Sequence, residues 1–135
     1  MRSINDYRYY KEALKNNSNN SAGKIPFKHS LIGRLIIKSV KPSTKMKVKT
    51  PAAFNPINSS LEENIVQKFL EIHKINMEFI AKCKSVDLSG IKIHSPFNKL
   101  VRYNLGDSFK IIMLHNRRHL EQAERVMNSE VFPSG

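Results

Sequence analysis

The sequence has no tryptophan, one cysteine and five glycines. What is scarce or missing in it excludes several kinds of site and classes of protein. A single cysteine, Cys83, cannot close a disulfide within the chain and leaves no CxxC pair for a zinc site. No apolar run approaches the roughly 18–20 residues that a membrane-spanning helix needs, and the opening MRSINDYRYYKEALK lacks the apolar stretch of a secretory signal. We therefore expect one cytoplasmic domain, residues 1–135, with no membrane partner.

Acidic residues are scarce in the first part of the chain. Residues 1–50 hold twelve Lys/Arg and two Asp/Glu, a balance of +10, whereas residues 51–135 hold eleven and nine, a balance of +2. The basic portion has no RNP-type aromatic pattern, GxxG loop or zinc finger. Its charge indicates a solvated surface that attracts anions in general, and nucleic-acid binding through residues 24–49 is the weaker alternative.

The spacing of apolar residues predicts an all-α chain. Residues 3–16 repeat apolar positions every three or four residues, which is helical spacing. Residues 29–40 form a short apolar segment that a helix fits better than a strand. Residues 16–27 and 41–59 are loop-like, the second rich in proline and lysine, and 129–135 form a tail.

The strongest helical signal covers residues 61–84. Ser60 and Glu63 match a capping box at its start. Its apolar residues fill about half of a helical wheel, and such a wide arc indicates contact with more than one neighbouring helix. This helix therefore belongs in a bundle.

Residues 86–104 are expected to connect this helix to the last one. The last helix should begin near Asn104, whose side chain can accept a backbone hydrogen bond, and should run to about residue 128. Asp107 is expected to serve the start of the helix.

Two histidines, His115 and His119, lie one turn apart on the last helix. With Phe109 at the centre of the apolar arc, both fall on one flank of it, while Arg117 and Arg118 lie on the solvated side. Neutral imidazoles at i,i+4 can converge on zinc, nickel or iron, although a mononuclear site needs a third protein ligand. The alternative is a pair of ordinary polar residues at the edge of a core.

The remaining histidines and the cysteine carry weaker signals. His73 lies within the apolar arc of the 61–84 helix, where a core histidine with one hydrogen bond is the usual case. His29 and His94 lie in or beside loops without a partner pattern. Cys83 is expected to be a buried, inert thiol. The chain has no GxSxG elbow, P-loop or dinucleotide-binding turn.

Over residues 7–128 the sequence resembles the DinB-like superfamily of four-helix bundles. Three elements carry the resemblance: Ser95–Pro96, Leu105–Asp107 and HNRRHLEQ, His115–Gln122. The resemblance implies an up-down four-helix bundle, truncated at its N-terminus, with a long Pro/Lys-rich loop between the second and third helices.

The resemblance also implies a metal site. In this family three inward histidines bind a divalent metal, two from the HxxxH motif and one from the second helix. Carried over, His115 and His119 become ligands for zinc, nickel or iron. The third histidine would lie before Met1, together with the first helix, so the site is expected to be incomplete. Asn116 stands where many members have glutamate.

Three hypotheses follow. The first is a metal-dependent transferase or hydrolase of this family, with a small thiol as partner, in which the metal lowers the pKa of a bound thiol or water. The second is a non-enzymatic, truncated bundle that acts through homo-oligomerisation, because the missing helices would leave the apolar arc of residues 61–84 open. The third is the basic-surface nucleic-acid binding described above.

Overall fold

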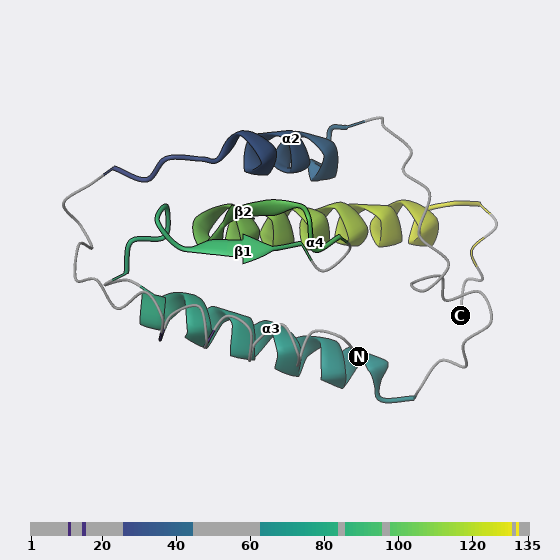
Figure 1. Ribbon diagram of the computed structural model, residues 1–135. Coiled ribbons are helices and arrows are strands. Elements are labelled where there is room, and N and C mark those ends of the chain that lie inside the picture. The colour runs from purple at the N-terminus through teal and green to yellow at the C-terminus, as the bar shows by residue number, and fades with distance from the viewer. Residues whose placement is uncertain are drawn as a thin grey trace.

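The computed structural model describes residues 11, 15, 26–44, 63–83, 86–95, 98–130 and 132, and the structural statements that follow concern these residues. The described elements are α2 (Leu31–Val40), α3 (Ile65–Lys82), β1 (Lys92–His94), β2 (Arg102–Asn104) and α4 (Leu105–Met127), labelled in Figure 1. The helix expected over residues 3–16 lies outside the described residues, apart from Lys11 and Lys15, which are both helical.

The 29–40 segment is a helix because its start is capped by a side chain. Ser30 Oγ accepts the backbone N–H of Gly33 at 3.0 Å, which satisfies one of the donors that a helix start leaves open. Gly33 and Ile37 are buried, one turn apart. The helix ends at Val40, shortly before Pro42, which cannot continue it.

The last helix confirms the prediction made for it. The side chain of Asn104 accepts the backbone N–H of Asp107 at 2.7 Å and so caps α4. The helix then continues to Met127, close to the expected end.

The middle helix, α3, is shorter than the expected 61–84. It begins at Ile65, and its N-cap residue Asn64 makes no side-chain capping bond. Glu63 lies in the turn before the helix, and Ser60 lies outside the described residues, so the proposed capping box does not start α3. The helix ends at Lys82, and Cys83 is its C-cap residue.

The expectation of a purely all-α fold is wrong for the segment between α3 and α4. There β1 and β2 pair antiparallel, with Ile93 opposite Tyr103. Burial alternates along β1, where Ile93 is buried between the exposed Lys92 and His94, and Ile91 just before the strand is also buried, which is the two-residue period of a strand. The chain is mostly helical, but a four-helix bundle is not confirmed within the described residues.

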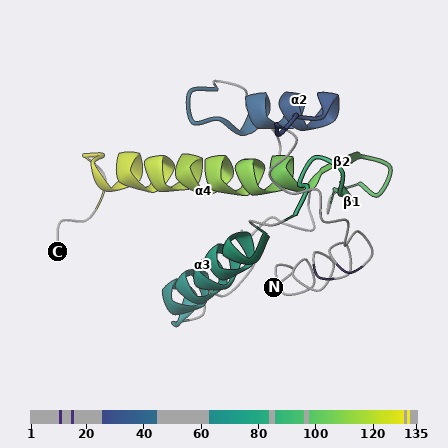
Figure 2. The ribbon, with the colours of Figure 1, turned by 90° about the vertical axis from the view of Figure 1, so that its left-hand side faces the viewer.

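Helix α4 lies between α2 on one side and α3 on the other, with the hairpin beside its first turns (Figure 1). The core gathers where these elements meet and consists of Phe79, Cys83, Ile91, Ile93, Tyr103 and Leu105. Figure 2 shows that α4 extends past α2 and the hairpin, while α3 diverges from it. The last turns of α4 therefore project from the packed end of the molecule.

The apolar arc of α3 is largely open to solvent, so the prediction that it packs against more than one neighbouring helix is not confirmed for the described residues. Phe79 is the buried residue of the helix, and it meets Phe109 of α4 edge to face at a centroid distance of 5.9 Å. The exposed apolar residues of α3 are Ile65, Val66, Phe69, Leu70, Ile75 and Met77. Within the described residues, α3 is thus anchored near its C-terminal end. None of the helices described here is long and apolar enough to span a bilayer.

Candidate metal centre

The structure brings His115 and His119 together on α4, as their spacing predicts. Their Nε2 atoms are 3.0 Å apart, and the rings meet edge to face at a centroid distance of 4.4 Å. One helical turn separates the two residues, so regular helix geometry alone makes the rings neighbours. The two Nε2 atoms therefore lie within hydrogen-bonding distance of each other.

Gln122 fixes which nitrogen of His119 carries the proton. Gln122 Oε1 lies 2.8 Å from His119 Nδ1, and because the amide oxygen only accepts, Nδ1–H donates to it. The Nε2 atom of His119 then has a free lone pair, and it accepts the Nε2–H of His115. A metal ion that took this lone pair would replace the hydrogen bond between the rings, and His115 would shift its proton to Nδ1.

The pair is exposed, which differs from the expected inward position. The helical wheel places both residues on the flank of the apolar arc, but in the structure both are exposed, although Arg118 between them still reaches the end of α2. Protein atoms still shield part of the His115 ring. This desolvation lowers the pKa of His115, and the charges of His119 and Arg118 lower it further. Low pKa values favour the neutral imidazole that binds metal.

The distance between the rings suits two ligands of one ion. Zinc bonds to imidazole nitrogens are about 2.0–2.1 Å long, so two nitrogens at a tetrahedral angle stand about 3.3 Å apart. The observed 3.0 Å needs a shift of a few tenths of an ångström, which two exposed side chains can make. The described residues hold no group of three or more His, Cys, Asp or Glu side chains that could bind a metal ion. The chain thus supplies two convergent ligands at this place.

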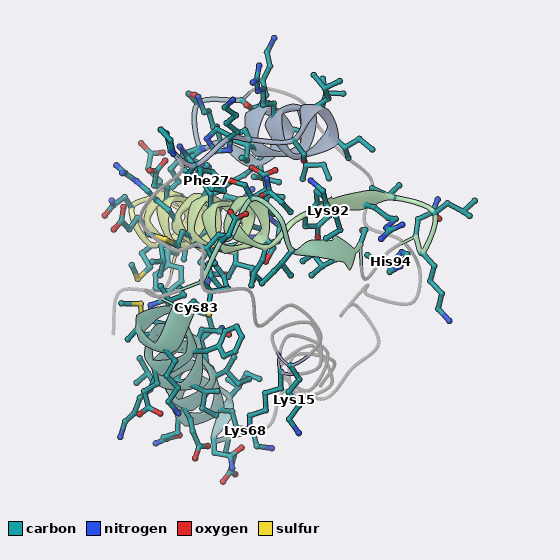
Figure 3. The ribbon with its side chains drawn as sticks, turned by 60° about the vertical axis from the view of Figure 1, so that its left-hand side comes forward. Lys15, Phe27, Lys68, Cys83, Lys92 and His94 are labelled. Carbon is teal, nitrogen blue, oxygen red and sulfur yellow. The ribbon has the colours of Figure 1, made fainter. Side chains whose placement is uncertain are left out.

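The other three histidines lie elsewhere. His29 Nδ1 is 2.5 Å from Asp107 Oδ1, and His94 Nδ1 is 2.5 Å from the carbonyl oxygen of Lys99. Figure 3 shows His94 on the hairpin, away from the helices. His73 is exposed on α3 and stacks on Phe69, so its expected interior position is wrong.

A small apolar cleft lies between α3 and α4, one turn of α4 before the histidine pair. His73, Met77 and Ile80 line it from α3, and Phe109, Ile112 and Met113 line it from α4. Ile112 precedes His115 by one turn on nearly the same face of α4. An apolar group held in this cleft would therefore lie near the two imidazoles.

Asp107 forms a second cluster, which holds two helix starts together. Its carboxylate accepts the backbone N–H of Ser30 at 2.9 Å and the hydroxyl of Ser30 at 2.7 Å. His29 contacts the other carboxylate oxygen, and the side chain of Asn104 donates to the carbonyl of Lys28 at 2.8 Å. Asp107 was expected to serve the start of its own helix. The structure shows that the carboxylate serves the start of α2 as well.

The buried carboxylate of Asp107 is kept ionised by these contacts. Burial raises its pKa, but hydrogen bonds from His29 and Ser30 together outweigh burial, so the net pKa lies below its ordinary value. We refer to Asp107, Ser30, His29 and Asn104 as the Asp107 clasp. Each of these four residues contacts another element or the start of a helix. We therefore assign the clasp to holding the fold together.

Cys83, Arg117 and Arg118 are the remaining residues for which the sequence predicted a position. Cys83 is buried at the end of α3 beside α4, as expected (Figure 3), and burial raises the pKa of its thiol. Arg117 forms an exposed ion pair with Glu121, as expected for a solvated face. Arg118 instead donates from Nη1 to the carbonyl of Ser39 at 3.0 Å and ties α4 to the end of α2.

The basic charge of the first part of the chain reaches the surface around α2. Lys28, Arg34, Lys38 and Lys41 are all exposed. These side chains would attract anions in general, and their arrangement on a short helix and its flanks gives no base-reading geometry.

Sequence reasoning missed the role of Gln122, although its position was informative. A residue three places after a helical histidine lies on the same face, where its side chain can orient the ring.

Comparison of the chain with models of protein families, with curated proteins and with solved structures gave no match.

Proposed function

We propose that this chain binds a divalent transition-metal ion through His115 and His119. The observation that carries the proposal is the 3.0 Å separation of the two Nε2 atoms, with His119 held in the required tautomer by Gln122. Zinc, nickel and iron(II) all accept imidazole nitrogen. The exposed position of the pair gives a metal ion direct access to both rings.

The DinB-like resemblance extends the proposal to metal-dependent transfer or hydrolysis. When bound, the metal would supply Lewis acidity and would lower the pKa of a coordinated thiol or water. His115 and His119 would hold it, and the cleft lined by Ile112 and Met113 would receive the apolar part of a small thiol. This step requires a coordination position that the protein leaves open.

Metal analysis tests the binding proposal directly. The purified chain is equilibrated with Zn²⁺, freed of unbound ion, and its zinc content is measured beside that of a His115→Ala/His119→Ala variant. We expect zinc on the wild-type chain and none above background on the variant. Circular dichroism should show equal helix content, because both side chains are exposed.

His73→Ala is the matched control. It removes a histidine that is also exposed on a helix but does not belong to the pair, and its zinc content should equal that of the wild-type chain. Equal zinc content in the double variant and the wild-type chain would contradict the proposal. Transfer chemistry is tested separately, as metal-dependent consumption of a small thiol with an electrophile, lost in the double variant.

A second candidate function is association through α3. The exposed apolar side chains of this helix, which include Phe69 and Leu70, favour it. We expect a Phe69→Lys/Leu70→Lys variant to sediment as a smaller species than the wild-type chain in the presence of a chelator. Identical sedimentation of the two proteins would argue against association through this face.

A further inference from the structure

We infer that the metal ion held by His115 and His119 joins two copies of this chain, each of which supplies the same pair of imidazoles. The inference rests on the metal-binding part of the proposed function and names its partner; it excludes the transfer chemistry, because four imidazoles leave no open position on the ion. The two chains would be related by a twofold axis through the ion, so each pair would make the same contacts.

The number of ligands is the first argument. A structural zinc ion binds four protein ligands in most sites, and the described residues of one chain bring two to this place. All five histidines and the cysteine of the sequence are described. His29 is engaged by Asp107, His94 lies on the hairpin, and Cys83 is buried in the core. His73 lines the cleft between α3 and α4, but it does not form a group of three with the pair. A second copy brings two further imidazoles in the same geometry and fills the shell.

The position of the pair is the second argument. His115 and His119 are both exposed on α4, and Arg118, which lies between them, reaches the carbonyl of Ser39 at the end of α2. A metal site completed within one chain needs its ligands on elements that face one another. Here both ligands lie on one helix and are open to solvent, so a second chain can reach them.

The residues around the pair are the third argument. Val126 follows His119 by two turns on the same face of α4 and is 57% exposed. Met113, Leu120 and Met127 lie on the adjoining face of the helix and are also exposed. Apolar side chains around a polar centre are typical of a surface that packs against a partner.

Four imidazoles would fill the coordination shell. The ion would then hold two α4 helices together as a structural element, without the open position that transfer chemistry needs. Metal binding and association, which the sequence presents as separate hypotheses, would be one property of this surface.

The test measures mass and metal content of the same samples. The chain is analysed by light scattering coupled to size exclusion, with Zn²⁺ and with EDTA, over a range of protein concentrations. We expect one zinc per two chains. At a free Zn²⁺ concentration one hundred times its dissociation constant for the dimer, the apparent dimerisation constant should rise by about a hundredfold over EDTA. His115→Ala/His119→Ala should show no change with zinc, and His73→Ala should behave as the wild-type chain.

A Val126→Glu variant tests the position of the contact. It keeps both imidazoles and places a charge on the same exposed face, so zinc-dependent dimerisation should weaken by about tenfold or more, a free-energy change of about 1.4 kcal/mol. Helix content by circular dichroism should be unchanged. Zinc-dependent dimerisation equal to that of the wild-type chain would overturn the placement of the contact on this face.

The outcomes separate the two proposals. One zinc per monomeric chain would overturn the dimer and leave the metal-binding function standing. Loss of zinc in His73→Ala would also overturn it, since the ligand would then come from α3 of the same chain. No zinc on the wild-type chain would overturn the metal-binding function, and the dimer with it.

Discussion

The carboxylate of Asp107, in the first turn of α4, accepts hydrogen bonds from both the backbone N–H and the hydroxyl of Ser30, the N-cap residue of α2. Ser30 in turn caps its own helix by accepting the N–H of Gly33. One carboxylate thus fixes the starts of two helices whose residues lie far apart in the sequence.

Removal of this carboxylate should destabilise the fold. Asp107 is fully buried, so Asp107→Ala leaves Ser30 and His29 without their acceptor in a buried place. We expect a loss of about 3 kcal/mol in the free energy of unfolding, measured by urea denaturation. Glu124→Ala, which removes an exposed carboxylate from the same helix, should change it by less than about 0.5 kcal/mol. Similar values for both variants would refute the assigned role of the clasp.

The clasp should also make stability depend on pH in the acid range. The pKa of Asp107 is lowered in the folded chain, so the unfolded chain binds a proton more readily. The contribution of Asp107 is therefore fully present above the ordinary aspartate pKa of about 3.9 and is lost as pH falls toward the lowered pKa of the folded state. We expect the stability difference between the wild-type chain and Asp107→Asn to shrink over that acid interval. A difference that stays constant with pH would contradict this.

Two glycines sit where a methyl group cannot. A Cβ on Gly106 would overlap the ring of Phe27, and a Cβ on Gly33 would overlap the carboxylate of Asp107. Alanine favours helix over glycine by up to about 1 kcal/mol. At Gly33 the buried, hydrogen-bonded carboxylate cannot move aside, so Gly33→Ala should destabilise the fold by about 1–3 kcal/mol net. The ring of Phe27 is 43% exposed and can turn away, so Gly106→Ala should cost less.

A double-mutant cycle gives the control for Gly106. Phe27→Ala removes the ring that a Gly106 methyl group would meet, so Gly106→Ala should cost less in the Phe27→Ala background than in the wild-type chain. Thermal unfolding of the four proteins measures the difference. If Gly106→Ala lowers stability equally in both backgrounds, its methyl group does not clash with Phe27.

The thiol of Cys83 should react slowly in the folded chain. It is 1% exposed, and burial raises its pKa, so little reactive thiolate forms. We expect labelling by a thiol reagent at neutral pH to be at least about a hundredfold slower than in denaturant, on the basis of opening free energies of a few kcal/mol. Fast labelling of the native protein would show that the end of α3 opens readily.

Gln122 should tune metal affinity without providing a ligand. Its amide oxygen holds His119 in the tautomer whose Nε2 can bind an ion. We expect Gln122→Ala to weaken zinc affinity by about 10–100-fold and Gln122→Glu to retain or raise it, in a competition assay with a chromophoric chelator. Asn116→Ala, on the same helix, is the control and should leave affinity unchanged.

The local patterns in the sequence predicted α2 and α4 but placed the start of α3 too early. Asn104 predicted the start of α4, and the spacing of His115 and His119 predicted that their rings would meet. Both features depend on residues within one or two helical turns. The hairpin was missed because its strands are three residues long, too short for an alternating pattern to stand out. The double role of Asp107 and the exposure of His115 depend on how distant segments pack, which no local pattern encodes.

Helix α3 is anchored in the core near Phe79 and Cys83, while the side chains toward Ile65 are open to solvent. Its amide hydrogens should then exchange in a gradient, fast at the first turns and slow near Phe79, because opening from the free end breaks few packed contacts. With increasing denaturant, the first turns of α3 would unfold first. The region where α2, the hairpin and the start of α4 meet would unfold last.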